Sequence, residues 1–229
     1  MEQESGSTPI LLAWSGGKDC LMALDRLYAD PRWQVVGLLT TTYLGSGRVQ
    51  SHAIRAEVLH AQADALGLRL FEAPLADAAD NATYLAAFAA GLGRARAATP
   101  ALQHIAFGDL ALADVRAWRE AELTKIGWQG VFPLWGEPTA ALARHFIQHG
   151  HRACLTCVDS TQIDPAFAGR AFDGDLLREL PPTADPCGEN GEFHTVVYSS
   201  GLFSHPLRLR RGEMLPGDER FRCIDFCLA

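Results

Sequence analysis

The chain has 229 residues, of which 48% are hydrophobic and 21% are charged, so it can bury a core and wholesale disorder is excluded. Its length suits one α/β domain, alone or with a small added lobe, and is too short for two full domains. The 20 basic and 27 acidic residues give a net charge of −7, which argues against a broad nucleic-acid or anionic-membrane surface.

The N-terminal segment and the cysteines indicate a cytoplasmic protein with no membrane association. No apolar run approaches the roughly 20 residues of a membrane span, and the segment 1–9 is acidic and polar rather than signal-like. Six cysteines are too few to serve as a disulfide framework in a chain of this length. We therefore expect free thiols.

The first half of the chain alternates strand and helix patterns. The apolar run 10–13 predicts a strand buried on both faces, and leucines at helical spacing follow it until Asp30-Pro31. A second buried strand is predicted at 35–39, which completes a β-α-β unit. The pattern then predicts a helix from Ile54 to its end at Gly67, a strand at 68–71, a helix at 81–98 and a strand at 105–107.

The second half continues the alternation of strand and helix patterns, and its composition changes in the final third. Val115, Trp118 and Ile126 predict a helix, and further patterns predict a helix at 138–149 and a strand at 153–158, before a Pro- and Gly-richer final third. We expect an α/β fold with a doubly wound, mostly parallel sheet and a smaller C-terminal α+β lobe. A soft boundary near Gly130 divides a nucleotide-binding domain (9–130) from an acceptor lobe (131–229).

The strongest motif is Ser15-Gly16-Gly17-Lys18-Asp19-Cys20, between a predicted buried strand and a helix. Two glycines allow the backbone to approach a ligand closely, and the amides at a helix N-terminus favour an anion. The lysine adds a positive charge. A plain tight turn with an exposed lysine is the alternative, but the combination favours a phosphate-binding loop at the carboxyl edge of the sheet.

The second motif is the segment 185–195, Asp-Pro-Cys-Gly-Glu-Asn-Gly-Glu-Phe-His-Thr. Carboxylates, an imidazole and a hydroxyl so close together are costly to bury, so a functional loop is the better explanation. A solvated turn before the predicted strand 196–198 is the alternative.

These two motifs resemble those of the diphthine-ammonia ligase-like family, which belongs to the PP-loop ATP pyrophosphatases. The first matches the PP-loop, with Cys20 where the family usually has Ser, and the second matches the family's Cys-Gly-Glu-Gly-Gly-Glu loop, with Asn190 for one glycine. The likeness covers roughly residues 9 to 207 and includes Phe107-Gly108-Asp109-Leu110, the stretch 116–120 and Pro133-Leu134-Trp135-Gly136, in the family's order.

The resemblance implies an adenine nucleotide alpha hydrolase-like fold and an ATP-dependent amide ligase. Such an enzyme splits ATP into AMP and pyrophosphate, activates a carboxylate as its adenylate and transfers it to ammonia or an amine. The expected partners are ATP, Mg²⁺ and a carboxylate-bearing acceptor, which would be elongation factor 2 only if the source is archaeal or eukaryotic. The nitrogen donor and the oligomeric state stay open.

Roles are assigned to residues on the same basis. The candidate catalytic residues are Lys18, Glu189, Glu192 and His194. The candidate nucleotide-binding residues are Ser15, Gly16, Gly17, Lys18, Asp19, Cys20, Thr40, His52, Gly108, Asp109, Asn190, Gly191 and Thr195.

Two of these residues, Asp19 and Asp109, are the candidate Mg²⁺ ligands, because magnesium prefers charged oxygen ligands. For Asp109 an N-cap of the following helix is the alternative. His52 is expected near the start of the second helix, whose N-terminus faces the nucleotide, and a purely structural histidine is the alternative.

The cysteines Cys154 and Cys157, with Cys223 and Cys227 as a second pair, have a spacing that also occurs in zinc sites. Side chains three apart on a strand face opposite sides, so we favour buried free thiols without a metal or redox role. A PP-loop enzyme that modifies tRNA and a nucleotide-binding regulator without turnover are the rival functions. The net charge of −7 argues against the first and the acidic loop against the second.

Overall fold

The computed structural model describes residues 6–49, 51–77, 79–216 and 219–229. Residues 1–5, which open the polar N-terminal segment, lie outside these ranges. Two sheets organise the chain. One is five-stranded and parallel, in the order β3-β2-β1-β4-β5, and the other is four-stranded and antiparallel, in the order β7-β6-β9-β8.

The first sheet and its helices take up the first half of the chain and the start of the second. Their bounds are β1 Thr8–Ala13, α1 Lys18–Ala29, β2 Trp33–Tyr43, α2 Ala56–Leu66, β3 Leu70–Leu75, α3 Asn81–Ala98, β4 His104–Ala106, α4 Ala113–Lys125 and β5 Gln129–Val131. The remaining elements are α5 Thr139–Gln148, β6 Arg152–Asp159, a short 3-10 turn at Pro165–Phe167, α6 Gly174–Glu179, β7 Phe193–Ser199, β8 Leu209–Met214 and β9 Phe221–Leu228.

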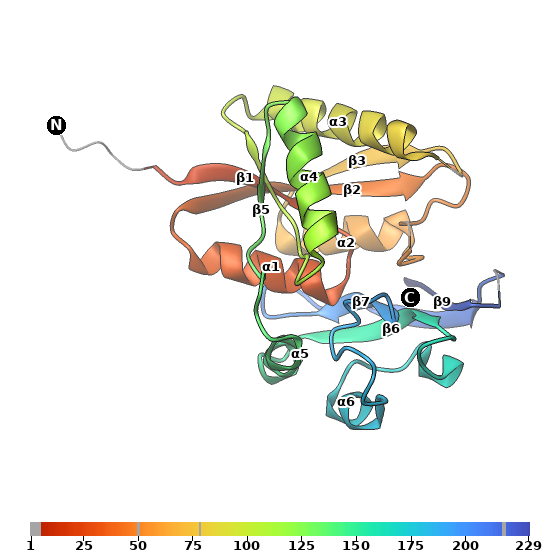
Figure 1. The fold of residues 1–229 in the computed structure, drawn as a ribbon. Helices are drawn as coiled ribbons and strands as arrows, with labels where there is room; N and C mark the ends of the chain where they lie inside the picture. The colour runs from red at the N-terminus through yellow and green to blue at the C-terminus, as the bar shows by residue number, and fades with distance from the viewer. Residues whose placement is uncertain (1–5, 50, 78, 217–218) are drawn as a thin grey trace.

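Helices cover both faces of the parallel sheet, which confirms the expected doubly wound arrangement (Figure 1). Helices α3 and α4 pack against the outer face of the parallel sheet. They do so through one hydrophobic core, which includes Leu11, Phe88 and Leu123. The larger core fills the other face, where α1 and α2 lie between the two sheets. The antiparallel sheet therefore packs directly against α1 and α2, and these two helices join it to the parallel sheet in one core.

The boundary expected near Gly130 falls inside β5, which is hydrogen-bonded to β4. The parallel sheet therefore continues to Val131, and the chain passes to the second sheet in the segment before α5. The physical reason is that β5 has only three residues, too few for a recognisable apolar pattern.

Several elements were predicted closely, and others only in part. Helix α3 has the predicted bounds, with Asp80 as its N-cap, and α2 ends on Gly67 in the left-handed conformation. Strand β2 runs beyond the predicted 35–39, and β3 begins at Leu70 rather than at residue 68. Both differences arise because β3 pairs with the extended part of β2, from Leu38–Leu70 to Tyr43–Leu75.

No helix in the described part of the chain is both long and apolar enough to cross a membrane.

Candidate functional site

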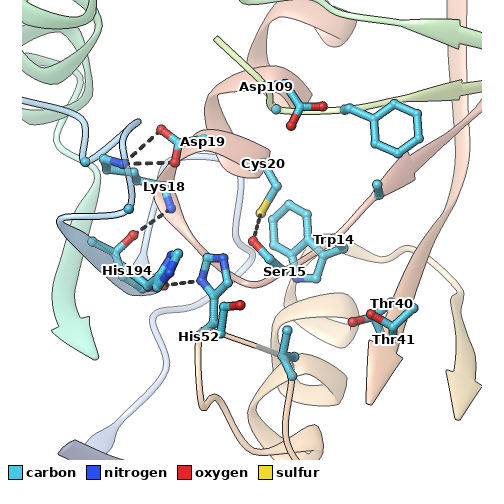
Figure 2. Close-up of a pocket in the computed structure, with 18 of the residues that line it drawn as sticks. Trp14, Ser15, Lys18, Asp19, Cys20, Thr40, Thr41, His52, Asp109 and His194 are labelled. Carbon is cyan, nitrogen blue, oxygen red and sulfur yellow. Dashed lines mark hydrogen bonds and ion pairs between the residues drawn. The ribbon is translucent and has the colours of Figure 1, made fainter. Parts of the chain in front are cut away.

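A cavity of about 360 Å³ lies at the carboxyl ends of β1, β2 and β4 (Figure 2). The strand order reverses beside β1, since β2 and β3 lie on one side of it and β4 and β5 on the other. Such a reversal opens a crevice at the carboxyl edge, where ligands bind in doubly wound sheets. The turns after β1 and β4 both line this cavity.

The glycines of the turn after β1 pack against the protein rather than line the cavity. Gly16 has a φ of +83°, and a Cβ there would come within 2.7 Å of Leu59 on α2. Its carbonyl oxygen accepts a hydrogen bond of 2.9 Å from the amide of Val197 on β7. A Cβ at Gly17 would lie 3.0 Å from His52 and 3.1 Å from the carbonyl oxygen of Thr195. We expected these two glycines to let a ligand approach the backbone closely. The structure shows instead that they let α2, the turn before it and β7 approach closely.

The other residues of this turn line the cavity, namely Ser15, Lys18, Asp19 and Cys20. The Cys20 thiol is buried and lies 3.0 Å from the carbonyl oxygen of Gly17, to which it donates. Burial raises the pKa of this thiol to about 11. Cys20 is therefore a neutral thiol with a partner at the N-cap of its own helix.

Lys18 is almost fully buried, with 1% of its surface exposed. Its ammonium lies 2.9 Å from the carboxylate of Asp19 and donates a second hydrogen bond to the carbonyl oxygen of Cys187. Burial opposes the charged form, but Asp19, Cys187 and Asp185 together outweigh it and raise the pKa of Lys18. The rings of Phe172 and Phe193 lie 5.7 and 5.4 Å from the ammonium. Lys18 thus connects the first domain with the loop 185–195.

Asp109 follows β4 and faces Arg119 of α4, with 2.9 Å between Oδ2 and Nε. Helix α4 has Leu112 as its N-cap and no side-chain cap, so the helix-cap alternative for Asp109 is wrong. The two atoms lack the alignment of a hydrogen bond, and both are buried without any such partner among the described residues. The charge of Arg119 therefore holds the Asp109 carboxylate at the wall of the cavity.

Thr40 lies in the carboxyl-terminal half of β2 and lines the same cavity. Its side chain is buried, at 3% exposure, and its hydroxyl oxygen has no hydrogen-bond partner within the described ranges. An unpaired buried hydroxyl is costly. It is therefore a candidate contact for a polar ligand atom.

His52 and His194 lie side by side, with ring centroids 4.5 Å apart (Figure 2). His52 precedes α2 by four residues, so it lies in the turn before the helix rather than at its N-terminus. Its neighbours Ser51 and Ala53 have φ values of 63° and 55° and are the non-glycine residues with positive φ in the described chain. This strained backbone fixes the imidazole at the cavity.

Burial keeps both imidazoles neutral. It lowers the pKa of His194 to about 4, with a further contribution from the charge of Lys18. It also lowers the pKa of His52 well below its ordinary value, with a contribution from His194. Neutral imidazole nitrogens can accept protons or hydrogen bonds from a ligand.

The carboxylate of Glu192 points into its own loop and does not line the cavity. It accepts hydrogen bonds of 2.7 Å from the amide of Asp185 and 3.0 Å from the amide of Asn190, and it is 1% exposed. The sequence predicted a catalytic role, and the structure gives Glu192 the role of an anchor of the loop. These amides come within reach of Glu192 only when the loop closes on itself, so the local sequence does not predict the contact.

Glu189 does line the cavity, but one of its oxygens is already engaged. Oε1 accepts hydrogen bonds of 3.0 and 2.8 Å from the amides of Leu110 and Ala111. Burial raises the pKa of Glu189, while these amides oppose the rise. Glu189 therefore ties the loop to the turn after β4 at the wall of the cavity.

The rest of the loop divides between two cavities. Thr195 accepts a 3.0 Å hydrogen bond from the first helical amide, that of Lys18, and lines the cavity. Gly191 and His194 line this cavity and a neighbouring one, whereas Asn190 is exposed and lines only the neighbour. Gly108 lies in the wall of the first cavity, beside the first turn of α1.

The sequence predictions missed an apolar wall and one cation. The wall is formed by Trp14, Leu39, Tyr84, Phe88 and Phe107. The cation is Arg119, whose side chain also lies over the Phe107 ring at 4.5 Å. An apolar wall beside polar groups suits a flat organic base linked to an anionic tail. The wall could have been predicted only in part, from the aromatic residues of α3.

One expectation about the cysteines was wrong, because Cys157 and Cys223 form a disulfide. They lie opposite each other on the antiparallel strands β6 and β9, a pairing that local sequence does not show. Cys154 and Cys227 are free, as expected. No group of three or more acidic, histidine or cysteine side chains in the described part could hold a metal ion by itself. Asp19 and Asp109 line one cavity without forming a complete metal site.

No protein-family model matches this chain, and a search of curated proteins found no match.

Proposed function

We propose that this protein binds ATP in the first cavity and uses it to form an amide, as a diphthine-ammonia ligase-like enzyme of the PP-loop type. The observation that carries the proposal is the meeting of two motifs. The Ser-Gly-Gly-Lys-Asp turn lies at the point of strand reversal, and the loop 185–195 lies against it through Lys18. The two segments are more than 160 residues apart in sequence, and Lys18 and Cys187 are separated by 169 positions.

The proposed reaction has two steps. A carboxylate oxygen attacks the α-phosphorus of ATP, and the bond to the β-phosphate oxygen breaks, which releases pyrophosphate and leaves an acyl adenylate. Ammonia or an amine then attacks the acyl carbon, and the carbon–oxygen bond to AMP breaks. The products are an amide, AMP and one proton, which must go to a base.

His194 is our candidate to relay that proton. Its imidazole lines the cavity and is unprotonated at neutral pH, and because its pKa is about 4 it passes the proton on to solvent rather than keeping it. It lies beside His52, whose ring supports its position. Glu189, another of the candidate catalytic residues, has one oxygen held by two amides and is better suited to position the loop over the nucleotide.

The cavity supports the binding of a nucleotide with its magnesium ion. The apolar wall of Leu39, Phe88 and Phe107 suits the adenine ring. Thr40 has a hydroxyl oxygen without a hydrogen-bond partner in the described part of the chain, and Asp109 has a carboxylate that is ion-paired with Arg119. Both groups are hard ligands, and Mg²⁺ in nucleotide sites binds one or two carboxylates together with phosphate oxygens and water. Asp109 and Asp19 would hold the ion, which when bound would draw negative charge from the phosphates.

The test is to measure nucleotide binding by calorimetry and the release of pyrophosphate from ATP with a panel of carboxylic acids and ammonia. We expect Asp109→Asn to impair Mg²⁺-dependent turnover, and the control Asp114→Asn, at an exposed position on α4, to leave it unchanged. Release of phosphate instead of pyrophosphate would contradict the proposed reaction. ATP binding without turnover on any acid would favour the rival function, a nucleotide-binding regulator that does not turn over ATP.

A further inference from the structure

A second cavity, of about 570 Å³, adjoins the first. The two share four lining residues, Val49, Ser51, Gly191 and His194. The second cavity lies where the carboxyl end of β2 meets the N-terminal end of β9, because Tyr43 and Phe221 both line it. His194 therefore stands in the wall that separates the two spaces.

The chemistry of the second cavity differs from that of the first. Its aromatic and aliphatic surface comes from Tyr43, Val49 and Phe221, which suits an apolar ligand body. Two guanidinium groups, Arg48 and Arg220, also line it, and each is paired with a carboxylate. Because these charges are matched, the apolar surface is the main feature that this cavity offers to a ligand.

Ion pairs hold the charged walls in place. Arg48 lies 2.8 Å from Asp225 of β9, and Arg220 lies 2.7 Å from Asp159 at the end of β6. Hydrogen bonds from Arg220 lower the pKa of Asp159, so this carboxylate stays charged. The cavity is therefore built from both halves of the chain.

We propose that the second cavity binds the acyl part of the acceptor, a carboxylic acid with an apolar body, whose carboxylate reaches the first cavity past His194. The inference rests on the proposed function, since it names the substrate class of that site. The apolar body lies against Tyr43 and Phe221, and the carboxylate points toward the nucleotide. The volume is sufficient, because pockets for small organic ligands measure about 300–1,000 Å³.

Acyl sulfamoyl adenosines, which are stable mimics of acyl adenylates, test this arrangement in the full chain. Calorimetry compares AMP, an acetyl probe and a 3-phenylpropanoyl probe. We expect the phenylpropanoyl probe to bind at least about tenfold more tightly than the acetyl probe, because burial of an aromatic group contributes more than the 1.4 kcal/mol that a tenfold change requires. In Tyr43→Ala and Phe221→Ala this ratio falls to about threefold or less.

The affinities for AMP and for the acetyl probe serve as internal controls and stay within about twofold in both variants. Tyr28→Ala, which removes an exposed ring on α1, leaves the ratio unchanged. Equal binding of the two probes, or a ratio that both variants preserve while AMP still binds, would overturn the acyl cavity alone. Failure of AMP and of both probes to bind would instead overturn the proposed function.

A third probe distinguishes a free acid from one displayed on a larger molecule. It carries a butyl amide at the far end of the phenyl ring. Either result supports the cavity: unchanged affinity indicates that the acid is displayed, and a loss of about tenfold or more indicates a free acid.

Discussion

The ammonium group of Lys18 donates a hydrogen bond to the carbonyl oxygen of Cys187, 169 residues further along the chain. The same ammonium pairs with the carboxylate of Asp19. A single buried charge therefore connects the turn after β1 with the loop of the second motif. This relationship explains why a residue expected to contact phosphate also has a structural role.

Replacing Lys18 by Met should reduce the free energy of unfolding by about 2–4 kcal/mol. This is below the full cost of breaking a buried ion pair, because the Asp19 side chain keeps 30% of its surface exposed. Denaturant unfolding measures the change. The control Lys125→Met removes an exposed lysine on α4 and should change the free energy by less than about 0.5 kcal/mol. Equal stability of both variants would contradict a structural role for Lys18.

Glu192→Gln should destabilise the fold without changing the affinity for nucleotide. The amide group of Gln would set a donor against the backbone amides of Asp185 and Asn190, which now donate to the carboxylate. We expect a loss of about 1–3 kcal/mol in the free energy of unfolding. Glu213→Gln, at an exposed position on β8, is the control. Weaker nucleotide binding at unchanged stability would indicate instead that Glu192 contacts the nucleotide.

Thr40→Val should affect stability and ligand binding in opposite directions. The Thr40 hydroxyl is buried without a partner, so the isosteric valine removes a desolvation cost and raises the free energy of unfolding of the ligand-free protein by about 1 kcal/mol. ATP, if it pairs with this hydroxyl, should bind about fivefold more weakly.

Thr156 provides the matched control for this experiment. Its hydroxyl is also buried without a partner among the described residues, but it lies on β6 and lines neither cavity. Thr156→Val should raise the stability similarly and leave ATP affinity unchanged. Equal effects of the two substitutions on ATP binding would exclude Thr40 from the nucleotide site.

The depressed pKa of His194 predicts that stability falls in mild acid. Its pKa is about 4 in the folded chain, against 6.5 ordinarily, so between these values the unfolded chain binds a proton that the folded chain does not. The free energy of unfolding therefore decreases as pH falls from about 6.5 to about 4, by about 1–3 kcal/mol from this group. Above pH 6.5 this group has no effect.

Urea unfolding at a series of pH values measures this dependence. His194→Gln should make it shallower, and the control His205→Gln, at an exposed position, should leave it as in the wild type. The opposite result, an unchanged dependence in His194→Gln, would show that this imidazole does not titrate as a buried group.

Reduction of the disulfide should lower the stability measurably. Cys157 and Cys223 are 66 residues apart, and closing a loop of that length in the unfolded chain corresponds to about 4 kcal/mol in the chain-entropy estimate. A dithiol reductant should therefore shift the denaturation midpoint of the wild type and of Cys154→Ser alike. It should have no effect on Cys157→Ser. A wild-type midpoint that does not respond to the reductant would show that this bond is absent in solution.

Local sequence patterns were enough to predict the elements that depend on near neighbours. Apolar runs and helical spacing predicted β1, α1 and α3, and the Ser-Gly-Gly-Lys turn marked the carboxyl end of β1. Because parallel strands share a carboxyl edge, the position of the first cavity could be predicted from the order of strands and helices alone. Thr40, His52 and Asp109, chosen from the sequence, all line that cavity.

The directions in which the polar side chains of the second motif point depend on contacts between distant parts of the chain. Glu189 and Glu192 are three residues apart, yet one reaches the cavity and the other turns into its own loop. The difference depends on the amides of residues 110 and 111 and on those of the closed loop, which local sequence does not specify. The Cys157–Cys223 disulfide and the second cavity likewise depend on the pairing of β6 with β9. Strand pairing over such distances is set by packing of the whole chain rather than by the propensity of either segment.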